Sequence, residues 1–106
     1  MPKYLFEGTF SPEAAQGLKK AGAASRPKVI GAMCAELGGT LESFYFAFGD
    51  VDVITICDLP DDEAAAAVSF AVSSAGSVGI KTVKLMTADE VDSALKRSVT
   101  YRPPGS

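Results

Sequence analysis

The chain has 106 residues, the length of one domain, and its 47 % hydrophobic and 22 % charged residues are typical of a folded globular protein. The formal net charge of −3 leaves no basic surface for a phosphate backbone, so nucleic acid is not an expected partner. Histidine and tryptophan are absent, which excludes Ser-His-Asp and Cys-His catalysis and ordinary haem or zinc ligation, and we expect no cofactor.

The chain begins with an alternating pattern that predicts a strand over residues 3–10. No long apolar run follows a basic start there, so we expect neither a signal peptide nor a membrane span, and we expect a cytoplasmic location. Ser11 is a predicted N-cap for a short helix that ends at Gly22. A second helix, with Ser25 as its cap, is predicted to stop at Gly38.

The middle of the chain predicts a hairpin. Residues 41–48 and 51–59 are rich in aromatic and β-branched side chains, and the two residues Gly49 and Asp50 between them fit a tight mirror-type turn. An alanine-rich helix is predicted to follow over residues 61–76, with acidic residues in its first turn.

The last third predicts one more strand and one more helix. Residues 78–86 are rich in β-branched side chains, Thr87 and Glu90 fit a capping box, and residues 99–106 form an extended tail. The order β-α-β-β-α-β with a terminal helix predicts an α+β, ferredoxin-like domain over residues 1–106, with helices on one face of a four-stranded antiparallel sheet.

Alternation along the hairpin assigns side chains to the two sheet faces. A two-residue turn pairs Phe46 with Val53 and places both, with Phe48, under the helices. The opposite face then carries Leu41 and an apolar centre of Leu5, Tyr45, Ile54 and Ile56. Because such a patch is larger than most monomers expose, we expect a second copy of the chain to cover it in a homodimer or higher homo-oligomer.

Two features look like reactive sites and have plainer explanations. Cys34 and Cys57 lie in apolar surroundings without a CxxC pattern, so we expect buried, reduced thiols in preference to a disulfide or a metal pair. The acids at residues 61–63 fit a capped helix start, and we expect no metal site there.

Several segments resemble the GYD-domain family, small bacterial proteins of largely unassigned function: "MPKYLFEGTFSPEAAQGLKKAG", "ASRPKVI", "LGGTLESFYFAFGDVDV", "DLPDD", "GIKTVKLMTADEVD" and "YRPPG". The resemblance spans nearly the whole chain and implies a ferredoxin-like domain assembled as a dimeric α+β barrel. The family motif is Gly-x-Tyr-Asp at the hairpin turn; Gly49 and Asp52 match it, and Val51 replaces the tyrosine. We expect Asp52 to serve the strand end, with ligand binding as the alternative.

Other dimeric α+β barrels include cofactor-free monooxygenases, muconolactone isomerases and haem enzymes. They commonly use histidine, tryptophan or asparagine in the pocket, and this chain contains none of them. A shared fold alone therefore gives little support for those activities.

Four further residues are candidates for a site. Glu7 and Tyr45 are predicted on the uncovered face, where partial desolvation would suit a general acid or base, although Glu7 would equally pair across a dimer. Arg26 at a helix start fits an anion site or a solvated charge. Lys81 fits an anion ligand or a base, or an edge-strand lysine that discourages further pairing.

These residues lead to three hypotheses of function. The first is a homo-oligomeric α+β barrel that binds a small anionic or aromatic metabolite between the sheet and its partner. The second is a cofactor-free acid–base enzyme of the isomerase type that uses Glu7 and Tyr45. The third is a structural or regulatory assembly module whose apolar face is wholly consumed by packing between subunits.

Overall fold

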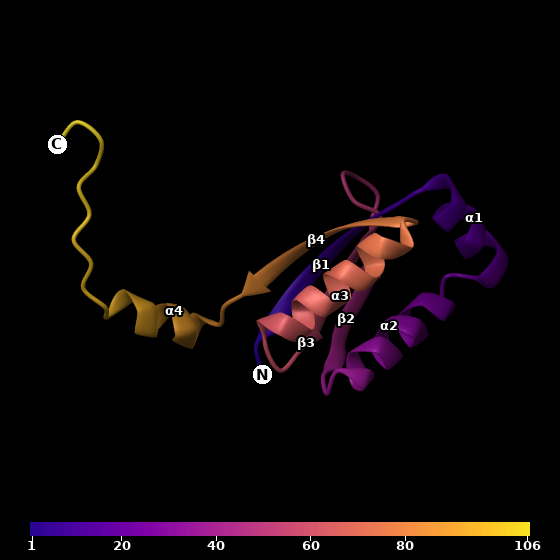
Figure 1. The fold of residues 1–106 in the computed structure, drawn as a ribbon, viewed down its shortest axis with the longest axis horizontal. Helices are drawn as coiled ribbons and strands as arrows, with labels where there is room; N and C mark the ends of the chain where they lie inside the picture. Colours follow the sequence, from indigo (N-terminus) through magenta and orange to yellow (C-terminus); the bar gives the residue numbers. More distant parts are fainter.

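The computed structural model describes residues 1–106 (Figure 1). The elements are β1 (Lys3–Phe10), α1 (Pro12–Ala21), α2 (Ser25–Glu36), β2 (Thr40–Phe46), β3 (Val53–Asp58), α3 (Asp62–Ala75), β4 (Val78–Leu85) and α4 (Ala88–Leu95). The strands form one antiparallel sheet in the order β2-β3-β1-β4. Helix α2 packs on β2 and α3 packs on β4, on the same face of the sheet. The predicted α+β, ferredoxin-like fold is confirmed.

Local side-chain hydrogen bonds fix most helix starts. Ser11 and Asp61 each accept a hydrogen bond from a backbone N–H three residues further on, and Thr87 and Glu90 form the predicted capping box. The predicted cap at Ser25 is wrong, because Ser25 is already the first helical residue of α2. Its hydroxyl instead donates to a carbonyl in the preceding turn at 2.7 Å, so α2 begins without a side-chain cap.

The core lies between the helices and the two central strands, β1 and β3. Its buried members are Tyr4, Phe6, Cys34, Cys57, Leu59, Ala65 and Val68. Tyr4 is 2 % exposed, and its hydroxyl donates to Asp62 Oδ1 at 2.6 Å, so this buried polar atom is satisfied. The helix-facing sides of β1 and β3 are those that alternation predicts.

The hairpin differs from its predicted form at the turn. The pairing of Phe46 with Val53 is confirmed, but β2 ends and β3 begins at this pair. A six-residue connection joins the two strands, and a 2.9 Å hydrogen bond from the N–H of Ala47 to the carbonyl of Asp52 closes it. The prediction that Phe48 lies under the helices is therefore wrong. Phe48 belongs to the loop, outside the alternation of the strand, and its side chain is fully exposed.

A β-bulge corrects a second assignment in β2. Leu41 stands opposite Cys57 and Ser43 opposite Ile56, so Glu42 is an extra residue in this strand. One extra residue shifts the alternation by one position. Leu41, predicted on the uncovered face, is instead on the helix side, where it packs against the core.

The C-terminal end of the chain leaves the body of the protein after β4 (Figure 1). From Met86 onward every residue is exposed. This arm explains why the radius of gyration is 16.9 Å, since a compact domain of about 100 residues has roughly 13 Å. No helix of the protein combines the length and apolar character needed to cross a membrane.

Candidate functional site

The sheet face opposite α2 and α3, called the open face below, brings three predicted site residues into one row. Tyr45 of β2 stands opposite Ile54 of β3, Ile54 opposite Glu7 of β1, and Glu7 opposite Lys81 of β4. Cross-strand neighbours of opposite charge, such as Glu7 and Lys81, attract each other. Tyr45 is 70 % exposed in the single chain, so nothing within the chain covers this row.

The rest of the open face is an apolar row beside a charged end. Ile56, Leu5 and Val83 are cross-strand neighbours in the next row. Beyond them Lys3 donates to Asp58 Oδ1 at 2.8 Å and also contacts Glu42. The hydrogen bond to Asp58, followed by the hydrogen bond to Glu42, raises the pKa of Lys3 to about 12.

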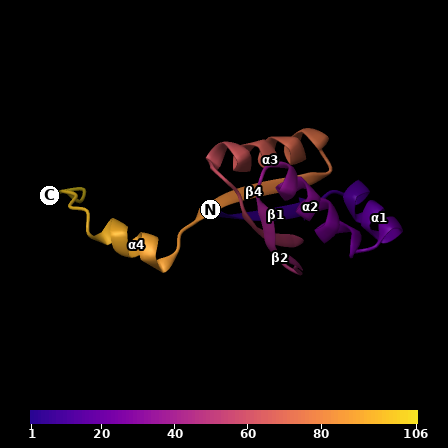
Figure 2. The same cartoon turned by 90° about the horizontal axis from the view of Figure 1, so that it is seen from below.

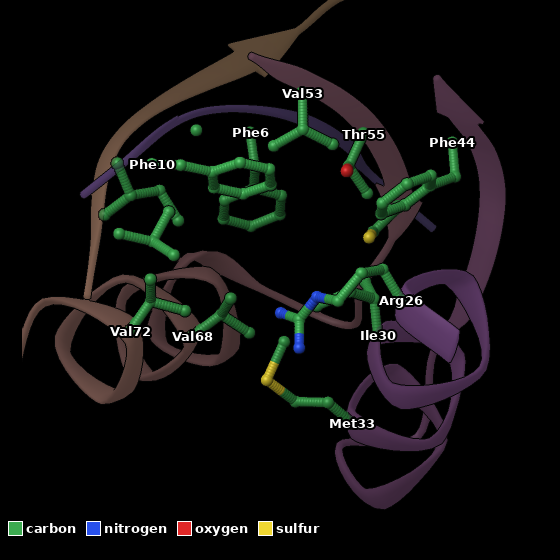
Figure 3. A pocket seen from close by; sticks show the side chains of 14 residues that line it. Phe6, Phe10, Arg26, Ile30, Met33, Phe44, Val53, Thr55, Val68 and Val72 are labelled. Carbon is green, nitrogen blue, oxygen red and sulfur yellow. The ribbon is translucent and has the colours of Figure 1, made fainter. Parts of the chain in front are cut away.

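A hollow lies on the other face, between α2 and α3 (Figure 3). Because these helices cover the outer strands, a helix-side cleft remains above the two central ones. It contains a cavity of about 60 Å³ whose lining is mostly hydrophobic, eleven of fourteen residues. The labelled side chains around it are Phe6, Phe10, Arg26, Ile30, Met33, Phe44, Val53, Thr55, Val68 and Val72.

Arg26 is the one charged residue that lines this cavity. It belongs to the first turn of α2, and its guanidinium points into the cleft between the two helices (Figure 3). None of the ion pairs in the protein includes Arg26, although its side chain is partly buried. A partly desolvated guanidinium without an acidic partner is a site that favours an anion.

A wider groove of about 630 Å³ continues from the cavity between α1, α2 and the end of α3. The cavity and the groove share Phe10, Arg26, Met33, Val72 and Val78, so they form one continuous space with Arg26 at the junction. Glu13 of α1 is the only other charged residue in the groove lining, and it is exposed.

The structure therefore separates Arg26 from the other candidates. None of Glu7, Tyr45 and Lys81 lines the cavity or the groove. Sequence reasoning missed the apolar cleft residues, because Met33, Val72 and similar positions look like ordinary core positions. Only the spacing of two helices in three dimensions shows that a space remains between them.

Asp52 has a structural partner. Its Oδ2 accepts a hydrogen bond from the backbone N–H of Phe10 at 2.7 Å, and its own N–H donates to the carbonyl of Gly8 at 2.8 Å. These bonds tie the β2–β3 connection to the end of β1. A ligand role for Asp52 stays a prediction.

The two cysteines lie beneath the cleft as free, buried thiols with their sulfur atoms 3.1 Å apart. Burial, and then the hydrogen bond from Cys34, raise the pKa of Cys57 well above its usual value. A protonated thiol is a poor nucleophile, so Cys57 acts as packing at neutral pH. No group of three or more metal-ligating side chains is brought together anywhere in the protein.

The fold and the cleft define a small ferredoxin-like α+β domain with an apolar space under its helices and an arginine at the opening. The chain belongs to the GYD domain family, whose model matches residues 4–95. The match ends with the last residue of α4, so the final segment lies outside the matched region. Comparison with curated proteins and with solved structures finds no match to either.

Proposed function

We propose that the protein is a homodimer that binds a small apolar anion in the helix-side cleft, with the acidic group of the ligand at Arg26. The observation that carries this proposal is an unpaired, partly buried guanidinium at the junction of an apolar cavity and a groove. This position differs from the one the sequence favours, between the sheet and a partner.

The open face supports the dimer. Its exposed Tyr45 stands beside Ile54, and Leu5 and Ile56 continue the apolar surface without any covering element. A two-fold axis makes one such patch complementary to itself, and a standard interface hides roughly 800 Å² per partner. A partner on the open face leaves the cleft on the outside of each subunit, accessible to a ligand.

The size of the space fits a small ligand. The groove volume of about 630 Å³ is within the range of roughly 300–1,000 Å³ that is usual for small-molecule sites. The cavity of about 60 Å³ is much smaller than the roughly 150 Å³ that an engineered cavity offers to benzene. We therefore expect the cavity to take a narrow apolar end and the groove to hold the rest.

The test uses three eight-carbon compounds with different head groups: octanoate, octanol and octylamine. A hydrogen bond to a charged group contributes about 1.5–3 kcal/mol, so octanoate should bind roughly 10–100 times more tightly than octanol. Arg26→Gln should remove this advantage and leave the binding of octanol unchanged. The measurement is the melting temperature and the calorimetric Kd of each pair.

Lys28→Gln is the matched control, because Lys28 is an exposed cation on the same helix that lines neither space. It should bind octanoate like the wild type. Equal binding of octanoate and octylamine by the wild type, or an unchanged preference for octanoate in Arg26→Gln, would contradict the proposal.

The cofactor-free acid–base enzyme is the second candidate, because Glu7, Tyr45 and Lys81 share one row. Glu7 and Tyr45 are two strands apart, about 10 Å across the sheet, so they would have to act on different ends of one substrate. If an isomerase activity is found, Glu7→Gln should abolish it. If no ligand binds on either face, the structural or regulatory assembly module is the remaining hypothesis.

A further inference from the structure

A buried hydroxyl group without a hydrogen-bond partner lies on the sheet side of the helix-side cleft. Thr55 of β3 is 5 % exposed and stands opposite Phe6 on one neighbouring strand and Phe44 on the other. Neither phenylalanine side chain can donate or accept an ordinary hydrogen bond. The Thr55 hydroxyl forms no hydrogen bond with any other side chain or with the backbone.

The same hydroxyl is open to the cavity. Every side-chain nitrogen or oxygen atom that is completely buried in the protein has a hydrogen-bond partner. Because the Thr55 hydroxyl has none, its oxygen retains some accessible surface, and Thr55 lines the cavity. Figure 3 shows this oxygen turned toward the inside of the cleft. A polar group in such surroundings costs free energy until a ligand or solvent atom pairs with it.

The cavity has two polar side chains in its lining, and they come from different layers of the fold. Eleven of the fourteen lining residues are hydrophobic, and the other three are Gly8, Arg26 and Thr55. Arg26 belongs to helix α2, whereas Thr55 belongs to strand β3. Helices and strands form separate layers, as Figure 2 shows for α3 above the sheet. A ligand with its acidic group at Arg26 therefore has Thr55 at the sheet side of its apolar part.

We propose that the ligand of the cleft has a second polar group, a hydroxyl or carbonyl oxygen remote from its acidic group, that forms a hydrogen bond with Thr55. This inference rests on the proposed anion site at Arg26 and adds the class of ligand, a hydroxy or oxo acid with an apolar middle. A threonine hydroxyl both donates and accepts, so it pairs with either kind of oxygen. A ligand without that oxygen leaves Thr55 unpaired, which is how a single polar group in an apolar pocket gives specificity.

Straight-chain ω-hydroxy acids of six, eight and ten carbons test this inference, each compared by calorimetry with the unsubstituted acid of the same length. In the wild type, at least one hydroxy acid should bind more tightly than its unsubstituted counterpart. Thr55→Val keeps the shape of the side chain and removes the hydroxyl, so it should lower the affinity for that hydroxy acid about 5–100-fold. It should leave the affinity for the unsubstituted acid unchanged or raise it.

Thr55→Ser is the matched control, because it retains a hydroxyl at the same position of β3 and should keep the preference for the hydroxy acid. A second control is α-hydroxyoctanoate, whose hydroxyl is beside the carboxylate and should give no advantage over octanoate that depends on Thr55.

Two results would overturn the inference and leave the anion site at Arg26 intact. One is a wild type that prefers the unsubstituted acid at every length, and the other is a Thr55→Val protein with the wild-type preference, since solvent then satisfies the hydroxyl. If no acid binds, or if Arg26→Gln binds the acids as the wild type does, the proposed anion site fails and this inference fails with it.

Discussion

At the scale of single residues, Gly8 of β1 sets the packing of the cleft floor. A Cβ atom at Gly8 would lie 2.6 Å from Val53 Cγ1 and 3.2 Å from Val78 Cγ1. Both neighbours are β-branched and have little rotamer freedom to move away. We therefore expect Gly8→Ala to lower the free energy of unfolding by about 1–3 kcal/mol, measured in urea.

Gly17→Ala is the control for the same chemical change. Gly17 lies inside α1 and has nothing within 4 Å of the added atom, so the substitution should raise stability by about 0.5–1 kcal/mol. A Gly8→Ala protein as stable as the wild type would show that the cleft floor is looser than the distances indicate.

The buried phenol of Tyr4 predicts a dependence of stability on pH. Burial first, and then the hydrogen bond to the Asp62 carboxylate, raise the pKa of Tyr4 to about 12 from a usual value of about 10. The folded state then holds this proton more tightly than the unfolded state. The contribution of Tyr4 is therefore complete below about pH 10 and is lost as the pH rises through about 12.

Tyr4→Phe isolates this effect in urea unfolding measured from pH 9 to 12. Lys3 has a pKa that is also raised to about 12, so the wild type loses stability over this range from two groups. The variant should lose less stability than the wild type as the pH rises. Parallel pH curves for the two proteins would show that the phenol is not held in its neutral form.

At the scale of elements, the predictions that succeed are those that depend on neighbouring residues. The caps at Ser11, Asp61 and Thr87 follow from local hydrogen bonds within three residues, and the structure contains all of them. The bulge at Glu42 and the longer hairpin connection depend on how β2 pairs with β3. No local pattern shows such a shift, which is why Leu41 and Phe48 are assigned to the wrong places.

The helix-side cleft escapes prediction for the same reason, because it depends on elements that are far apart in the sequence. Its walls come from α2 and α3, which are far apart in the sequence and pack on different outer strands. The sequence identifies Arg26 as an anion candidate from its place at a helix start. It does not show that an apolar cavity lies beside it, because the apolar residues of a cavity and of a filled core have the same pattern.

At the scale of the whole molecule, the open face leads to a prediction about assembly. Ile54 lies in the middle of this face, between Tyr45 and Glu7 in the cross-strand row. A lysine there would bury a charge within the proposed interface, where the desolvation penalty exceeds what its cross-strand pairing with Glu7 returns. We expect Ile54→Lys to be a folded monomer by light scattering at a concentration where the wild type is a dimer.

Ala35→Lys is the matched control, since Ala35 is exposed on α2, on the opposite side of the sheet. It should leave the dimer intact. If Ile54→Lys keeps the mass of the wild-type dimer, the subunits meet through another surface.

We propose that the ligand lies under the helices and not on the open face. Titration of the protein with octanoate, followed by NMR of its methyl groups, tests the claim most directly. We expect the methyl signals of Ile30, Val68 and Val72 to shift together while that of Ile54 does not. Shifts concentrated at Ile54 and Ile56, with the cleft unchanged, would contradict it and return the ligand to the open face.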